Sequence, residues 1–242
     1  MKKHCLVGLI VLLLAGSVFA EMRIWRDQAG RQYEGTFSKM IGKDVMVVSP
    51  SGKKHYLPYS NLSEGDTDYL SDIIVPETEV RFLTTKKAKV RSKNALADDF
   101  VSIVTGVAQV RLNAKHPNDT MRAEAYMVGK DRVTGKYKLL SKGSSALKFT
   151  EENEYQDAFQ LVGESRYFGD YNREVRGVEY CGYVVFVLNR KNEIVNHTTN
   201  LSFVTEDKFE RIRQLQTWFF FGESCKRVST PRPAYSVNRV GI

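Results

Sequence analysis

The segment VEYCGYVVFVLN (178–189) constrains the fold most strongly, because it is apolar at odd and even positions alike. A strand without a polar face must be covered on both sides, so we expect it at the centre of a sheet. NRKNE (189–193) then predicts a turn, and IVNHTTNLSFV (194–204) predicts the returning strand of a hairpin. MRAEAYM (121–127) alternates as a half-buried strand does. Together these patterns predict an antiparallel, immunoglobulin-like β-sandwich over residues 80–235.

Two further features lie inside this predicted sandwich. The run VSIVTGVAQVRLNAK (101–115) changes its apolar phase at Gly106, which favours a bulge or a strand bend there. One late helix is expected after Thr205, with apolar residues at helical spacing: Phe209, Ile212, Leu215 and Phe219. We interpret the aromatic run at 218–221 as core, in preference to an exposed platform for a sugar or a membrane. The tail (230–242) is expected to be extended or disordered.

The N-terminal residues have the three parts of a secretory signal peptide. Lys2 and Lys3 precede an apolar run, and AGSVFA (15–20) then offers small residues for cleavage after Ala20. The alternative is an uncleaved membrane anchor, for which the apolar run is shorter than the roughly 20 residues that span a bilayer. We therefore expect export to the periplasm, the outer surface or the medium.

Residues 21–75 predict a separate small module. Short strand patterns occur in RIWRD, YEGTF, DVMVVS and KKHYLPY, and turn signals separate them. Ser63 can cap a short helix that carries Tyr69, Leu70 and Ile73 on one side. Four or five short strands and a closing helical turn indicate a strongly bent sheet or barrel. Pro76 stops the helix, so the boundary is expected between Ile74 and Val80.

The same module resembles a known family. Two motifs carry the resemblance: W-x-D-x-x-G from Trp25 and LS-x-x-D-x-x-YL from Leu62. They are accompanied by Tyr33, Phe37, Gly42, Asp44, Val45, Gly52, Tyr56 and Leu57. This order is similar to the SLA-type homology domain, first class, a small SH3-like barrel whose adaptor member recognises Asn-Pro-Phe peptides. The resemblance implies an SH3-like barrel over residues 23–74 and a role in peptide binding, with a purely structural spacer as the alternative.

Three tyrosines are the candidate contact residues of such a barrel. SH3-like barrels bind extended peptides across aromatic surfaces, and a Tyr hydroxyl tolerates solvent. We therefore expect Tyr33, Tyr56 and Tyr59 to form the binding surface, whereas Trp25 and Phe37 fill the small core.

The distribution of charge indicates which classes of partner the protein can bind. The net charge of +8 is spread evenly, and its densest patch is TTKKAKVRSK (84–93). The patch is interpreted as a solvated strand edge, with an anionic polymer or a membrane surface as the alternative partner and no nucleic acid expected.

Cys181 and Cys225 would remain after cleavage, and an oxidising compartment favours a disulfide between them if their Cα atoms lie within about 7 Å.

No motif indicates catalysis. Ser165 lacks the G-x-S-x-G elbow, and His55, His116 and His197 stand apart from metal-ligand spacing. The acidic segment 149–157 lacks the order of a calcium loop and is interpreted as a solvated turn. We expect no catalytic residue, metal or cofactor.

The sequence thus favours an exported, non-enzymatic envelope or surface protein that mediates protein–protein interaction or adhesion and binds a protein or peptide. The alternative is a hydrolase or binding protein acting on an envelope or extracellular polysaccharide. A deep cleft with convergent acids or histidines would favour the enzyme.

Overall fold

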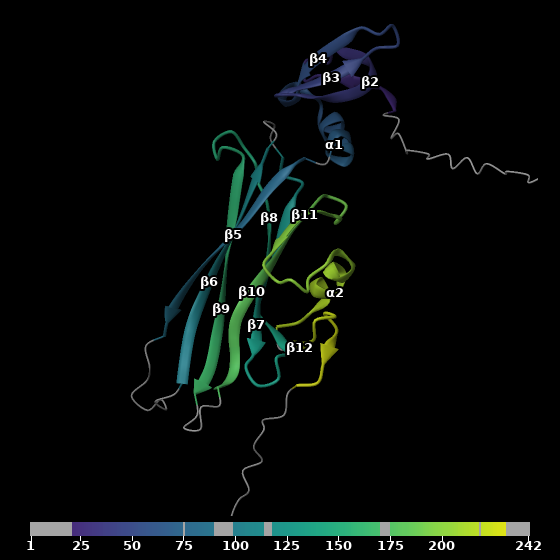
Figure 1. Ribbon diagram of the computed structural model, residues 1–242. Coiled ribbons are helices and arrows are strands. Elements are labelled where there is room, and N and C mark those ends of the chain that lie inside the picture. The colour runs from purple at the N-terminus through teal and green to yellow at the C-terminus, as the bar shows by residue number, and fades with distance from the viewer. Residues whose placement is uncertain are drawn as a thin grey trace, which may run out of the picture. The chain divides into compact units, whose positions relative to one another are not determined.

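The computed structural model describes residues 21–74, 76–89, 99–113, 118–169, 175–217 and 219–230 (Figure 1). The expected signal peptide (1–20) and nearly all of the expected tail lie outside these residues. The chain divides into two compact units, Met1–Asp66 and Thr67–Ile242. No helix among the described residues is long and apolar enough to cross a membrane.

The first unit is a small four-stranded antiparallel sheet at the place of the expected barrel, and we keep the name barrel for this unit. Its four strands pair in chain order: β1 (Met22–Arg26), β2 (Gln32–Ile41), β3 (Asp44–Val48) and β4 (Lys54–Pro58). The 3-10 turn η1 (Tyr59–Asn61) follows, and a bridge between Asp27 and Leu62 brings the chain back to the end of β1. Trp25 is fully buried, so the unit has an aromatic centre.

Asp66 fastens the end of this unit to its first strand. Its carboxylate accepts hydrogen bonds from the Arg23 guanidinium at 2.6 Å, the Arg26 backbone N–H at 2.7 Å and the Ser63 hydroxyl at 2.8 Å. Asp66 lies in the first turn of α1 (Glu64–Ile73), where a carboxylate is favoured by the helix dipole. Ser63 therefore contributes to the helix start, although its hydroxyl donates to Asp66.

The second unit contains one folded-over antiparallel sheet. Its strands run in the order β13-β12-β8-β7-β10-β9-β6-β5, and β11 pairs with β10 beside β9. The long strands are β5 (Thr78–Ala88), β6 (Asp99–Leu112), β7 (Arg122–Asp131), β8 (Tyr137–Ala146), β9 (Gln156–Gly169) and β10 (Val175–Leu188). The short elements are β11 (Ile194–Thr199), η2 (Glu206–Lys208), α2 (Phe209–Gln214), β12 (Phe220–Phe221) and β13 (Arg227–Val228).

Two leaves of this sheet pack face to face as a sandwich. One leaf is β5, β6 and β9, and the other is β7, β8 and β10. The core between them joins Phe82, Val104, Ala108 and Leu161 to Ala125, Met127 and Val185. The mainly β, sandwich-like fold expected from the sequence is therefore confirmed.

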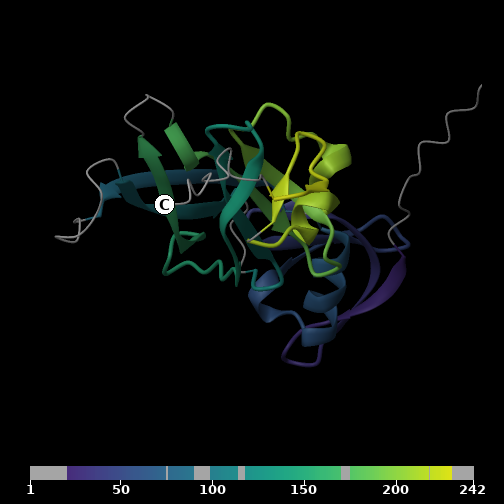
Figure 2. The ribbon, with the colours of Figure 1, turned by 90° about the horizontal axis from the view of Figure 1, so that it is seen from below.

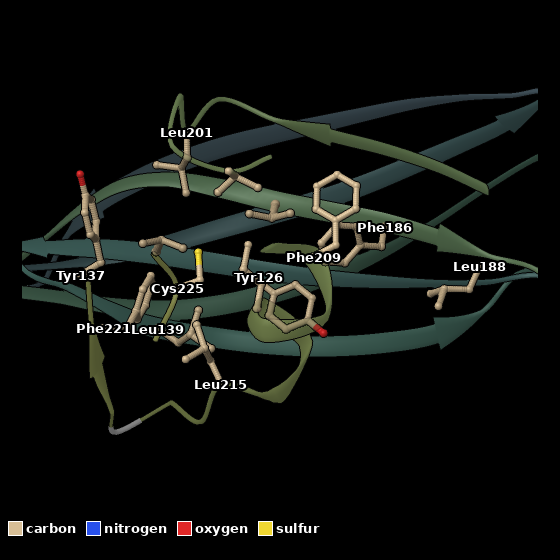
Figure 3. Packing of buried hydrophobic residues seen from close by; sticks show 14 residues of the cluster. Tyr126, Tyr137, Leu139, Phe186, Leu188, Leu201, Phe209, Leu215, Phe221 and Cys225 are labelled. Atoms are coloured by element: carbon tan, nitrogen blue, oxygen red, sulfur yellow. The ribbon is translucent and has the colours of Figure 1, made fainter. Parts of the chain in front are cut away.

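A second core lies on the other face of β7, β8 and β10. Tyr126, Phe186, Phe209, Leu215 and Phe221 pack there beneath α2 and β12 (Figure 3). Figure 2 shows α2 and the yellow segment that contains β12 and β13 gathered on one side of the second unit. β10 is thus covered on both sides, and Val184–Leu188 are fully buried, as its double apolar pattern predicts.

The late helix and the aromatic run are also located. α2 is only six residues long and ends at Gln214 instead of continuing to Phe219. Phe220 and Phe221 are buried, which supports the interpretation of this run as core. Trp218 lies outside the described residues.

Gly106 does not mark a bulge. β6 pairs with β5 and β9 in unbroken register through Gly106, opposite Thr84 and Leu161. The phase change arises because Val101 and Ile103 lie on the outer face of the leaf, whereas Gly106 lies under the ring of Phe82. The glycine is therefore explained by the close approach of that ring.

The expected disulfide is absent. Cys181 and Cys225 are both free, although both belong to the core beneath α2. Cys181 is the extra residue of a register shift in β10, and Cys225 lies in a turn with φ of 57°. Both side chains nevertheless pack in one apolar cluster, where burial raises the pKa of each thiol to about 11.

Candidate functional site

The three candidate tyrosines of the barrel do not form one surface. Tyr33 lies opposite Trp25 in the β1–β2 ladder, on the inner face, and its ring contacts His55 at a centroid distance of 5.5 Å. Tyr56 lies opposite Met46 on the other face and is 53% exposed. Tyr59 is half-buried in η1. Tyr56 is therefore the most accessible of the three.

Trp25 and Phe37, the expected core residues of the barrel, are buried to different extents. Trp25 is fully buried and donates its indole N–H to the Gly35 carbonyl at 2.9 Å. Phe37 is half-buried, with its ring 6.4 Å from that of Trp25.

A polar cleft in the second unit is the better-formed candidate site. Its volume is about 460 Å³, which is within the range of small-molecule sites. Residues of β7, β8, the β10–β11 turn and α2 line it. Its lining consists of Glu124, Tyr126, Lys142, Gly143, Ser144, Asn192, Glu210, Arg213 and Gln214.

Glu124 is the centre of the cleft. Its two carboxylate oxygens accept hydrogen bonds from Arg213 at 2.9 and 3.2 Å. Arg122 donates to the same carboxylate at 2.7 Å, and the Tyr126 hydroxyl donates at 2.8 Å. This carboxylate is therefore bound by two guanidinium groups and one phenol.

Arg213 extends the network to two other elements. It donates to Glu210 on α2 at 2.8 Å and to the Asn192 side-chain oxygen at 2.8 Å. Arg122 donates to the same Asn192 oxygen. Asn192 occupies the β10–β11 turn with φ of 67°, a conformation that Asn tolerates better than most residues. Helix, turn and sheet thus converge on one ion-paired centre.

The network shifts the pKa values of Glu124 and Tyr126. Burial alone would raise the pKa of Glu124, but hydrogen bonds from Arg213 and Tyr126 outweigh it and hold the pKa below its ordinary value. Burial, with the adjacent Glu124 carboxylate, raises the pKa of Tyr126 strongly. Near neutral pH the carboxylate is ionised and the phenol is protonated.

Local sequence explains how these side chains meet. Alternation along β7 places Glu124 and Tyr126 on the face that α2 covers, and the i,i+3 spacing on α2 puts Glu210 beside Arg213. The rim adds exposed groups that can donate or accept hydrogen bonds, the Ser144 hydroxyl and the Gln214 amide. The cleft can therefore bind a ligand rich in hydroxyl or carboxylate groups.

The other groups considered for chemistry have structural roles. The Ser165 side chain is fully buried, donates to the Val178 carbonyl and accepts from the Tyr180 N–H. His197 packs on Phe209 at 4.6 Å. His116 lies outside the described residues. Within the described ranges no group of three or more metal-ligating side chains is present.

The acidic segment 149–157 forms a turn. The Asn153 side chain bonds the backbone at the start of the turn: its oxygen accepts from the Thr150 N–H at 2.9 Å and its amide donates to the Lys148 carbonyl at 2.6 Å. Asp157 accepts from the Lys148 N–H at 2.8 Å.

Sequence reasoning did not find the cleft. The alternation in 121–127 predicts a solvent-exposed face that carries Arg122, Glu124 and Tyr126, whereas in the structure α2 covers Glu124 and Tyr126. The sequence does not show that Arg213 of α2 lies beside Glu124 of β7.

No protein-family model and no curated protein sequence matches the chain. Among solved structures, the structural-genomics target SoR45 is similar over 50% of this chain and 79% of its own, at 8% identity and a TM-score of 0.25. The β-D-glucoside glucohydrolase of Trichoderma reesei matches 61% of this chain and 20% of its own, at 11% identity and a TM-score of 0.25. DesR, a β-glucosidase of Streptomyces venezuelae, matches 62% of this chain and 16% of its own, at 13% identity and a TM-score of 0.20. Likenesses this weak carry no argument about fold or activity.

Proposed function

We propose that the protein is an exported, non-enzymatic binding protein of the cell envelope or cell surface, which mediates protein–protein interaction or adhesion. The polar cleft beside α2 holds a hydroxyl- or carboxylate-bearing group of the partner, and the barrel adds a second contact through Tyr56. The observation that carries the proposal is the ion-paired state of the carboxylates that the cleft contains.

Binding fits this chemistry better than hydrolysis does. A glycoside hydrolase needs one carboxylic acid that is protonated near neutral pH. The pKa of Glu124 lies below its ordinary value, and its oxygens are occupied by Arg213, Arg122 and Tyr126. Glu210 is bound to the same Arg213. Fixed ion pairs of this kind orient donors without supplying a proton.

The donors of the cleft are held in place before a ligand arrives. Lys142 donates to the Leu215 carbonyl at 3.0 Å, which fixes its ammonium against the end of α2. Such preorganisation lowers the entropy that binding must overcome.

The test uses the full chain and envelope fragments sedimented from the source cell. Ser144→Trp fills the cleft from an exposed strand position without removing an ion pair, and we expect about tenfold weaker binding to the fragments. Thr85→Trp is the matched control, because Thr85 is also an exposed strand residue but lies on β5. It should bind as the unmodified protein does.

Two outcomes would contradict the proposal. Equal binding by the two Trp variants would exclude the cleft as the contact. Time-dependent release of soluble sugars from the fragments, abolished by Glu210→Gln, would establish a hydrolase instead.

A further inference from the structure

A second candidate surface lies at the end of the second unit where four strands begin or end together (Figure 1). β5 ends there at Ala88, β6 begins at Asp99, β9 ends at Gly169 and β10 begins at Val175. Phe100 and Tyr167 are paired across β6 and β9, with stacked rings 5.2 Å apart at 17°. Phe100 is nevertheless 45% exposed, so an aromatic side chain faces solvent.

Two cations lie beside the Tyr167 ring. Lys86 lies over the Tyr167 ring at 6.0 Å and Arg132 lies over it at 5.6 Å. Both also contact the Glu179 carboxylate, and their side chains remain 44% and 46% exposed. We call Lys86, Phe100, Arg132 and Tyr167 the strand-end surface.

The register places these residues on the sheet itself. Lys86 pairs with Val104 of β6, which is buried in the sandwich core, whereas the adjacent Lys87 pairs with Ile103 on the outer face. Phe100 has the same parity as Val104. Lys86 and Phe100 therefore lie on the same face of the leaf as Val104, and both side chains are exposed toward the end of the strands.

We propose that the strand-end surface binds an acidic polysaccharide lying along this exposed part of the sheet. The apolar C–H face of a sugar ring packs on the Phe100 ring, and the carboxylates of the chain pair with Lys86 and Arg132. Glu179 holds both cations beside Tyr167 before the ligand arrives, so their charges are already oriented. The proposal does not depend on the cleft beside α2.

The placement of Phe100 favours a polymer over a lipid surface. A membrane-inserting side chain projects from a loop, but Phe100 is fixed in a ladder opposite Tyr167. Its ring cannot enter a bilayer unless the strand ends enter as well. Single-stranded nucleic acid combines stacking with negative charge too, so the experiment must distinguish it.

The test measures binding of the full chain to alginate, a linear polymer of uronic acids, by titration calorimetry. Neutral dextran, oligothymidylate and phosphatidylglycerol vesicles are the comparison probes. We expect alginate to bind, with affinity falling as salt rises, and dextran not to bind. Phe100→Ala should weaken alginate binding about tenfold, and Lys86→Gln should weaken it about threefold and reduce the salt dependence.

Matched controls lie on the opposite face of β5, the strand that carries Lys86 and pairs with β6. Leu83→Ala truncates an apolar side chain that is 54% exposed, and Lys87→Gln removes the charge next to Lys86. Both should bind alginate normally, and thermal unfolding should confirm that each variant is folded. Absent alginate binding, or equal losses in the variants and their controls, would overturn the proposal. Tighter binding of oligothymidylate or of the vesicles than of alginate would overturn the assignment to a polysaccharide.

Discussion

Substitution of Gly106 by Ala should destabilise the sandwich although both residues are small. A Cβ at Gly106 would lie 2.8 Å from Cε1 of Phe82 and closer still to its Cζ. Phe82 is 8% exposed and stacks on Tyr183 at 4.6 Å, so its ring cannot move freely. Overpacking of this kind costs about 1–3 kcal/mol of unfolding free energy.

The change in unfolding free energy caused by Gly106→Ala should reverse its sign when the Phe82 ring is removed. Phe82→Ala alone should cost about 3–5 kcal/mol, because it truncates a buried aromatic. In that background Gly106→Ala meets open space, and the loss of glycine's flexibility in the unfolded chain should restore about 0.5 kcal/mol. The coupling free energy between the two substitutions should therefore be about 1.5 kcal/mol or more.

Urea unfolding of the four proteins, followed by circular dichroism, measures this coupling. If the double variant does not fold, Phe82→Leu replaces Phe82→Ala in the cycle. A Gly106→Ala variant as stable as the unmodified protein, or a coupling near zero, would refute the argument that the ring requires the glycine.

Three further predictions concern other parts of the chain. Trp25→Ala should unfold the barrel at a cost of about 3–5 kcal/mol, whereas Tyr56→Ala should leave its circular dichroism unchanged; equal losses would place Tyr56 in the core. Glu124 has a lowered pKa when folded, so its contribution to stability is present above the ordinary glutamate pKa of 4.5 and is lost as the pH falls through the lower folded pKa. Glu124→Gln should therefore flatten the acid limb of a plot of unfolding free energy against pH; an unchanged limb would contradict this. Burial raises the pKa of Cys181 and Cys225 to about 11, so at pH 8 both thiols should react with a maleimide slowly when native and fully when unfolded; an unreactive unfolded chain would indicate a disulfide.

The fold was predictable where its signal is local. The apolar run 178–189 predicts β10, and the turn after it predicts β11, because hairpin partners are adjacent in sequence. The Lys-rich run after Thr84 predicts a strand edge, and β5 is indeed the last strand of the sheet order. Each of these predictions rests on residues that are adjacent in the sequence.

The cleft was not predictable for the opposite reason. Arg213 reaches Glu124 across 89 residues, and Arg122 reaches Asn192 across 70. No periodicity within β7 indicates that a later helix will cover its polar face. Gly106 shows the same limit, because the ring that requires it belongs to a neighbouring strand.

The order of the strands has a consequence for the folding kinetics. The barrel strands β1 to β4 pair only with chain neighbours, so their hydrogen bonds close short loops. β6 instead pairs with β9 across β7 and β8, and β10 pairs with β7 across β8 and β9, so these hydrogen bonds close long loops. Loop closure over such distances carries an entropic cost before any contact compensates it, which slows folding to the millisecond-to-second range typical of sandwiches. The barrel should therefore reach its native structure while the leaves of the sandwich are still unpaired.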